Sequence, residues 1–101
     1  MNISVKRIGG FAGLSEDVAV VNTTELEAAK AQQVEQMVQS IGLFDLPATI
    51  AGGTIGADLF YYEITVAEGG RQHTVTFVDD DSPETAALRK LVDSLKSLHS
   101  L

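Results

Sequence analysis

The sequence predicts a single α+β domain, residues 1–101, in which two β-hairpins are each followed by a helix in the order ββαββα. Three observations support this prediction. Two pairs of segments alternate between apolar and polar residues, as strands with one buried face do. A glycine-containing turn joins the segments of each pair, and apolar residues recur at helical spacing after each pair. We therefore expect a four-stranded, mainly antiparallel sheet with both helices packed on one face.

The first hairpin is predicted from strands at Asn2–Ile8 and Leu14–Asn22. The second strand carries apolar residues on both faces, so both are expected to be covered: Val18 and Val20 on one, Ala19 and Val21 on the other. The turn between the strands places three glycines around Phe11. Glycine adopts backbone conformations that strain other residues, so this turn can bend sharply and hold Phe11 outward. The alternative is an ordinary turn with Phe11 folded back onto the core.

A helix is expected at Glu25–Ile41, where apolar residues fall within one arc. Thr24 and Glu27 have the spacing of a capping box at its start, and Gly42 is suited to end it. The connection that follows, Leu43–Ala57, has no clear element and exceeds the usual loop length. Loops of this length are often functional, and the alternative is a tolerated insertion.

The second hairpin is predicted from strands at Asp58–Glu68 and Gln72–Val78. Its first strand alternates clearly, with Phe60, Tyr62, Ile64 and Val66 on the core face and Tyr61, Glu63 and Thr65 on the other. Asp79–Asp81 ends the second strand. Ser82–Glu84 then has the cap, proline and acidic residue of a helix start. A stripe of apolar residues continues the last helix: Leu88, Leu91, Val92, Leu95 and Leu98.

The order of the elements predicts which turns share one end of the sheet. The Gly9–Leu14 turn lies where the first strand finishes. We expect the first helix to run back along the sheet, so that the Leu43–Ala57 connection begins at this same end. The second hairpin then leaves from this end and returns to it at Asp79–Asp81. We call it the loop end, and the opposite end, with the turn at Glu68–Arg71, the hairpin end. Glycines, apolar residues and carboxylates gathered on one rim suit protein binding.

Charge and composition exclude several classes of function. The net charge is -7, from 14 acidic and 7 basic residues, which argues against binding to nucleic acid or to an anionic membrane surface. The chain has no cysteine, so disulfides and thiolate chemistry are excluded. No apolar run has membrane-spanning length and no signal pattern is present at Met1–Arg7, so we expect a soluble protein of the cytoplasm.

No set of residues suits catalysis or a metal site. His73 and His99 match no metal-ligand spacing, so both are expected to be structural. The glycine-rich segments lack the spacing of phosphate or dinucleotide loops. Asp79–Asp81 lacks the glycine and distal glutamate of a calcium loop, and its simplest interpretation is a solvated turn before a helix. We therefore expect no cofactor, no metal in the free protein and no enzymatic activity.

Three segments resemble the emfourin family, which comprises inhibitors of protealysin. They are Ile8–Leu14 after the first strand, Leu43–Pro47 after the helix, and Gly56–Val66. The strand Gln72–Val78, followed by an acidic turn and a leucine-rich helix, is similar too. The resemblance covers essentially the whole chain. It implies a protein inhibitor of thermolysin-family zinc metalloproteases, especially the protealysin-like enzymes of bacteria, that blocks the active-site cleft tightly and reversibly with flexible loops.

The resemblance leads to a hypothesis in which the loop end meets the enzyme. A catalytic zinc keeps one position open for water, and a carboxylate of the inhibitor could take that position. Asp58 is our first candidate because it ends a glycine-rich loop, and Asp79–Asp81 holds reserve carboxylates. Apolar side chains, above all Phe11, would fill the substrate pockets of the enzyme. The predicted protease-binding residues are Gly10, Phe11, Leu14, Ile55, Asp58 and Asp80.

Three alternatives remain open at this point. A non-inhibitory protein-binding module or adaptor would use the same rim but leave peptidase activity unchanged. A small enzyme would need a polar pocket with a matched acid and base, and no such set is evident. An oligomer could form through outer strands of an open sheet, although we expect a monomer when the protein is free.

Overall fold

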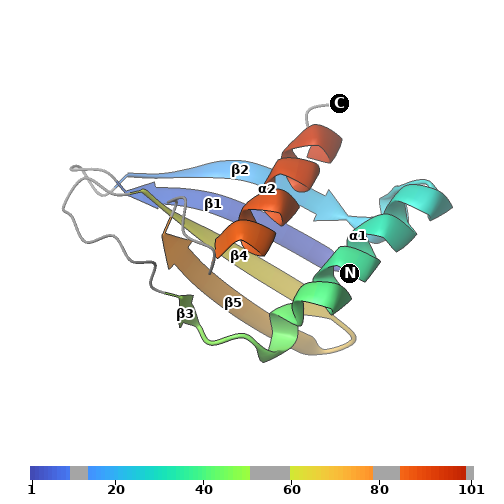
Figure 1. Ribbon diagram of the computed structural model, residues 1–101. Helices are drawn as coiled ribbons and strands as arrows, with labels where there is room; N and C mark the ends of the chain where they lie inside the picture. Colours follow the sequence, from blue (N-terminus) through green and yellow to red (C-terminus); the bar gives the residue numbers. More distant parts are fainter. Residues whose placement is uncertain (10–13, 51–59, 79–84, 100–101) are drawn as a thin grey trace.

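The computed structural model describes residues 1–9, 14–50, 60–78 and 85–99, and these residues form a sheet with two α-helices packed against it (Figure 1). Within this part of the chain the sheet has five strands in the order β2-β1-β4-β5-β3. The strands are β1 Asn2–Gly9, β2 Leu14–Asn22, β3 Thr49–Ile50, β4 Phe60–Glu68 and β5 Arg71–Val78. The α-helices are α1 Ala28–Ile41 and α2 Ala86–His99. The predicted α+β class and the two hairpins are confirmed.

The prediction of four strands is wrong, because β3 adds a fifth. Thr49 and Ile50 run parallel to β5, beside Thr76 and Phe77, and the amide of Thr76 donates to the carbonyl of Ala48 at 2.8 Å. A strand of two residues is too short to show an alternation of apolar and polar side chains. It forms because the neighbouring strand offers an unpaired edge, which a local sequence pattern does not reveal.

The expected course of the first helix is also wrong. Helix α1 crosses the strands at the hairpin end instead of running back along the sheet (Figure 1). Just beyond its end, Phe44 lies under the guanidinium of Arg71, the first residue of β5, with 4.1 Å between the guanidinium carbon and the ring centre. The short strand β3 then runs parallel to β5, towards the loop end. The chain thus reaches the predicted end by a different route.

A cap explains where α1 ends but not where it begins. The side chain of Asn22 accepts a hydrogen bond from the amide of Thr24 at 3.1 Å, which starts a 3-10 turn at Thr23–Glu25. The predicted capping box is therefore wrong: Glu27 is the N-cap of α1 and makes no side-chain cap. The predicted C-cap is confirmed, because Gly42 has a φ of 70° and its amide bonds back to the last turn of the helix.

Within the described part of the chain, helices cover only one face of strand β2. A β-bulge shifts the pairing with β1, so that Val5 faces Ala19 while Lys6 faces Asp17. Ala19 and Val21 are buried, whereas Val20 is 58% exposed. The prediction that both faces are covered is therefore wrong, because both described α-helices pack on the same side of the sheet.

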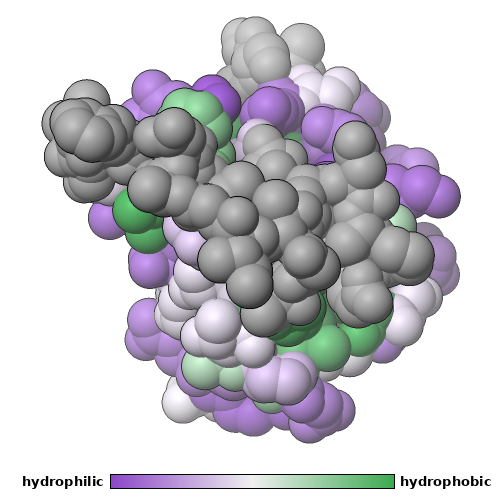
Figure 2. Space-filling model, turned by 60° about the vertical axis from the view of Figure 1, so that its left-hand side comes forward, coloured by the Kyte–Doolittle hydropathy of each residue, from purple (hydrophilic) through white to green (hydrophobic). Residues whose placement is uncertain are grey.

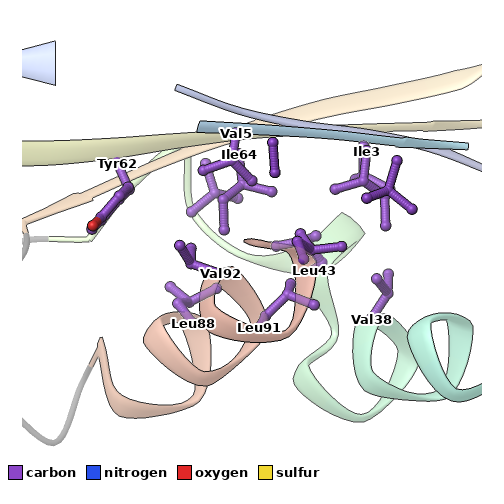
Figure 3. Packing of buried hydrophobic residues seen from close by; sticks show 14 of the residues in the cluster. Ile3, Val5, Val38, Leu43, Tyr62, Ile64, Leu88, Leu91 and Val92 are labelled. Atoms are coloured by element: carbon purple, nitrogen blue, oxygen red, sulfur yellow. The ribbon is translucent and has the colours of Figure 1, made fainter. Parts of the chain in front are cut away.

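The core lies between that side of the sheet and the two helices (Figure 3). Its sheet side comes from alternate residues of four strands: Ile3, Val5, Ala19, Val21, Tyr62, Ile64, Val66, Val75 and Phe77. Its helix side includes Val34 and Val38 of α1 and the predicted stripe of α2, and Leu43 completes it after α1. Leu98, also in that stripe, is partly buried against the cluster. Burial of these side chains stabilises the fold, at about 25 cal/mol per Å² of apolar surface removed from water.

Candidate functional site

The ends of four strands meet at the loop end. Gly9 pairs with Leu14 on one side and with Phe60 on the other, and Tyr61 pairs with Val78. Residues 10–13, 51–59 and 79–84 therefore join the described chain at this end. The prediction that the Leu43–Ala57 connection begins here is wrong, because Leu43 and Phe44 lie beside Arg71 at the hairpin end. Gly9 has a φ of 137°, which residues with a Cβ rarely adopt, so a glycine is required where β1 ends.

The predicted protease-binding residues are concentrated in those three segments. Gly10, Phe11, Ile55, Asp58 and Asp80 lie outside the described residues, as do Asp79 and Asp81. Leu14 opens β2 opposite Gly9, so its backbone is at the loop end. Ile50, the last described residue before 51–59, is partly buried against the core beside Phe77.

Phe60 and Tyr62, on one face of strand β4, form an aromatic cluster that borders these segments. Tyr62 is 7% exposed, and its ring centre lies 5.5 Å from that of Phe77 in the core. Tyr61 points to the opposite face and is 38% exposed, so the predicted core and surface pair is confirmed. Phe60 shares the face of Tyr62 but is 39% exposed, because it lies one row beyond the end of the core.

Arg7 connects this cluster to the first hairpin. On the face of β1 that holds the buried residues Ile3 and Val5, the next side chain is Arg7, which lies between Glu16 and Tyr62 of the neighbouring strands. Its guanidinium carbon stands 3.9 Å from the centre of the Phe60 ring. A guanidinium nitrogen is 3.8 Å from Glu16, and the two side chains are 36% and 70% exposed. Such an exposed pair contributes little to stability.

Helix α2 closes the other side of the cluster. The ammonium group of Lys96 lies 5.9 Å from the centre of the Tyr62 ring, and an open hollow is lined by Tyr62, Arg89, Val92 and Asp93. The core-facing residues of β1 and β4 therefore change in character towards the loop end. Aliphatic residues give way to an aromatic and charged surface between α2 and the end of the sheet.

The described residues hold neither a cluster of metal ligands nor a membrane-crossing helix. Among residues 1–9, 14–50, 60–78 and 85–99, no three His, Asp or Glu side chains gather as a metal site would require. In the same part of the chain no helix has the length and apolar character to cross a membrane. His73 lies in β5 with its Nε2 atom 2.6 Å from the carbonyl oxygen of Leu46, which fits the structural role predicted for it.

Sequence reasoning missed Arg7 and Phe60 as members of this site. A signal was present, because Arg7 breaks the apolar alternation that Ile3 and Val5 establish. The partner of Arg7 was not predictable, since Phe60 lies more than fifty residues away in the sequence. Only the pairing of β1 with β4 brings the two side chains together.

Comparison with known proteins gives one result. No curated protein and no solved structure matches the chain significantly. The sequence model of the emfourin family matches residues 5–96, a range that begins within β1, includes the second hairpin and ends within α2. Because this match spans most of the chain, the protein belongs to the emfourin family, a family of inhibitors.

Proposed function

We propose that this protein inhibits thermolysin-family zinc metalloproteases of the protealysin-like type by blocking the active-site cleft with its loop end. The match to the emfourin family over residues 5–96 carries this proposal. The meeting of four strand ends supports it, since three connecting segments join the sheet on one rim. A rim of several loops on a rigid sheet is a common arrangement for binding another protein.

The proposed mechanism uses a carboxylate and apolar side chains of this rim. The catalytic zinc of such an enzyme holds a water molecule at its open position. In our proposal an oxygen of Asp58 displaces that water, and Asp80 is the reserve carboxylate. Phe11, with Leu14 and Ile55 beside it, fills substrate pockets of the enzyme, and Gly10 allows the close approach of the backbone.

Titration of a protealysin-like enzyme tests the function directly. Peptide hydrolysis is followed while the protein is added to a fixed concentration of enzyme, and activity should fall in proportion until the two are equimolar. Excess Zn²⁺ should not restore activity, because the inhibitor blocks the cleft and does not remove the metal. Unchanged hydrolysis with several thermolysin-family enzymes would contradict the proposal. Binding without loss of hydrolysis would favour the adaptor alternative.

Variants of the rim test the mechanism. Asp58→Ala and Phe11→Ala should each weaken inhibition by about 30-fold or more, the effect of losing a central interface residue. Asp45→Ala is a matched control, because Asp45 is exposed near the hairpin end, beside Glu68 and Arg71. Full potency of both rim variants, with an unchanged unfolding transition, would show that these residues are not the contacts.

A further inference from the structure

The side chain of Arg7 is not explained by the stability of the fold. Ile3 and Val5, on the same face of β1, are each 1% exposed in the core. At the next position of this face an aliphatic side chain would continue the apolar surface. Arg7 instead buries its Nε atom, which has no hydrogen-bond partner within the described chain. An unpaired buried donor is unfavourable, and the exposed ion pair with Glu16 compensates for little of that.

The position of Arg7 is explained by its contact with Phe60. The guanidinium lies over the ring at 3.9 Å, a distance at which a cation and an aromatic ring attract each other. This contact restricts the rotation of a ring that is 39% exposed. A rigid, exposed aromatic side chain loses little conformational entropy on binding, and such residues dominate the binding energy of many interfaces.

Phe60 is also placed where the proposed interface begins. It is the first residue of β4, directly after residues 51–59, and its partner Gly9 directly precedes residues 10–13. Both neighbouring segments hold residues that we propose as protease contacts. The core has ended at this row, since Tyr62 lies at the edge of the buried cluster (Figure 3). On the face of the molecule that includes the loop end, hydrophobic residues reach the surface in separate patches (Figure 2).

We propose that Phe60 contacts the target metalloprotease beside its active-site cleft and that Arg7 is a positioning residue that holds the Phe60 ring for this contact. The inference rests on the proposed function and adds to it a contact in the described part of the chain. It differs from the proposed mechanism because neither residue reaches the zinc. Their role is to provide a rigid apolar surface at the border of the blocked cleft.

The protein contains a matched control for this pair. Arg71 stacks on Phe44 at 4.1 Å, nearly the same distance as Arg7 on Phe60. The Arg71–Phe44 pair lies at the hairpin end, so it is at the opposite end of the sheet from the proposed interface. Both pairs join a strand to a residue distant in sequence. Phe44 is partly buried against the core, whereas Phe60 is 39% exposed. Truncation of Phe44 should therefore cost at least as much stability as truncation of Phe60, but only Phe60 should affect inhibition.

The experiment compares the inhibition constants of single variants in the hydrolysis assay. Phe60→Ala should raise the constant by about 30-fold, as expected for an aromatic contact residue. Phe44→Ala should change it by less than about 2-fold, within the range of a residue outside the interface. Urea unfolding of both variants measures any loss of folded protein. If Phe60→Ala does not fold, Phe60→Leu keeps the apolar volume and should still raise the constant several-fold because the ring is lost.

A double-mutant cycle separates positioning from general stability. Arg7→Leu should weaken inhibition about 10-fold in the unaltered protein but add almost nothing in the Phe60→Ala background. Arg7→Lys keeps a cation over the ring and should recover most of the potency. Equal effects of Arg7→Leu in both backgrounds would overturn the positioning role of Arg7.

Failure of this inference can be told apart from failure of the proposed function. If the unaltered protein inhibits and Phe60→Ala inhibits equally well, the inference is wrong and the function stands. Equal losses of potency in Phe60→Ala and Phe44→Ala would also overturn the inference, because the loop end and the hairpin end would then contribute equally to inhibition. If the unaltered protein does not inhibit any such enzyme, both proposals are wrong.

Discussion

Phe77 is a core residue of β5 that lies beside the added strand β3. It is fully buried, its ring packs on Tyr62 at a tilt of 31°, and Ile50 of β3 lies beside it. We predict that Phe77→Ala lowers the free energy of unfolding by about 3 to 5 kcal/mol, because truncation leaves a cavity that the sheet cannot close. Urea unfolding measures this change. Gln72→Ala, at an exposed position of the same strand, is the control, and a loss below about 1 kcal/mol for Phe77→Ala would contradict the described core.

Gly42 ends α1 through its backbone conformation alone. Its φ is 70°, and a Cβ added there would meet no atom within 4 Å. We predict that Gly42→Ala lowers the free energy of unfolding by about 1 to 2 kcal/mol, the cost of the left-handed conformation for a residue with a side chain. Thermal unfolding of this variant and of Ser40→Ala, at an exposed position of the same helix, measures the effect. Equal stability of the two variants would show that the left-handed turn is not needed.

The position of each strand in the sheet determines how firmly its amides are held. Strands β1 and β4 are paired on both sides, whereas β2 is paired along one side and β5 meets β3 only at Thr76 and Phe77. We predict that the amides of β1 and β4 exchange with solvent most slowly, since their hydrogen bonds open only when much of the sheet opens. Hydrogen exchange followed by NMR tests the order. Slower exchange in β2 than in β1 would contradict this sheet.

The sequence predicted the packing of α2 but not the direction of α1. The stripe of α2 was predicted and its members are buried or partly buried in the core, because the side that faces the sheet is a property of the helix itself. The direction of α1 was predicted incorrectly. Its apolar arc can pack on a sheet at several angles, and the contact of Phe44 with Arg71 at the hairpin end accompanies the crossing that is observed.

Among the described strands, the β2 edge of the sheet resists pairing with a second molecule. Strand β2 forms this edge, and it carries a β-bulge together with the exposed residues Glu16 and Asp17. Bulges and charges on an edge strand disfavour pairing with a second molecule, and the net charge of -7 adds repulsion between copies. We predict a monomer with a radius of gyration near 13.4 Å. Sedimentation and X-ray scattering over a range of concentrations test this, and growth of the radius with concentration would contradict it.

The candidate site was predictable in its location but not in all its members. Element order placed the glycine-rich turn and the acidic turn on one end of the sheet, whereas the long connection begins at the other end and only reaches the loop end through β3. The contacts Gly10, Phe11, Leu14, Ile55, Asp58 and Asp80 remain predictions, and the variants above test Phe11 and Asp58. Arg7 and Phe60 were missed because each has an ordinary local explanation, as a strand residue at the surface and as a core residue.

The sequence by itself determined the α+β class, the two hairpins and the two helices, because alternation, helical spacing and turn residues act between neighbours in the chain. The predicted ββαββα order is incomplete, because β3 stands between α1 and the second hairpin. It also determined the likeness to the emfourin family, which the family match confirmed. The tertiary structure alone decided three features: the fifth strand beside β5, the crossing of α1 at the hairpin end, and the stacking of Arg7 on Phe60. Each of these features depends on contacts between segments that are distant in sequence, and the packing of the whole core determines which segments meet.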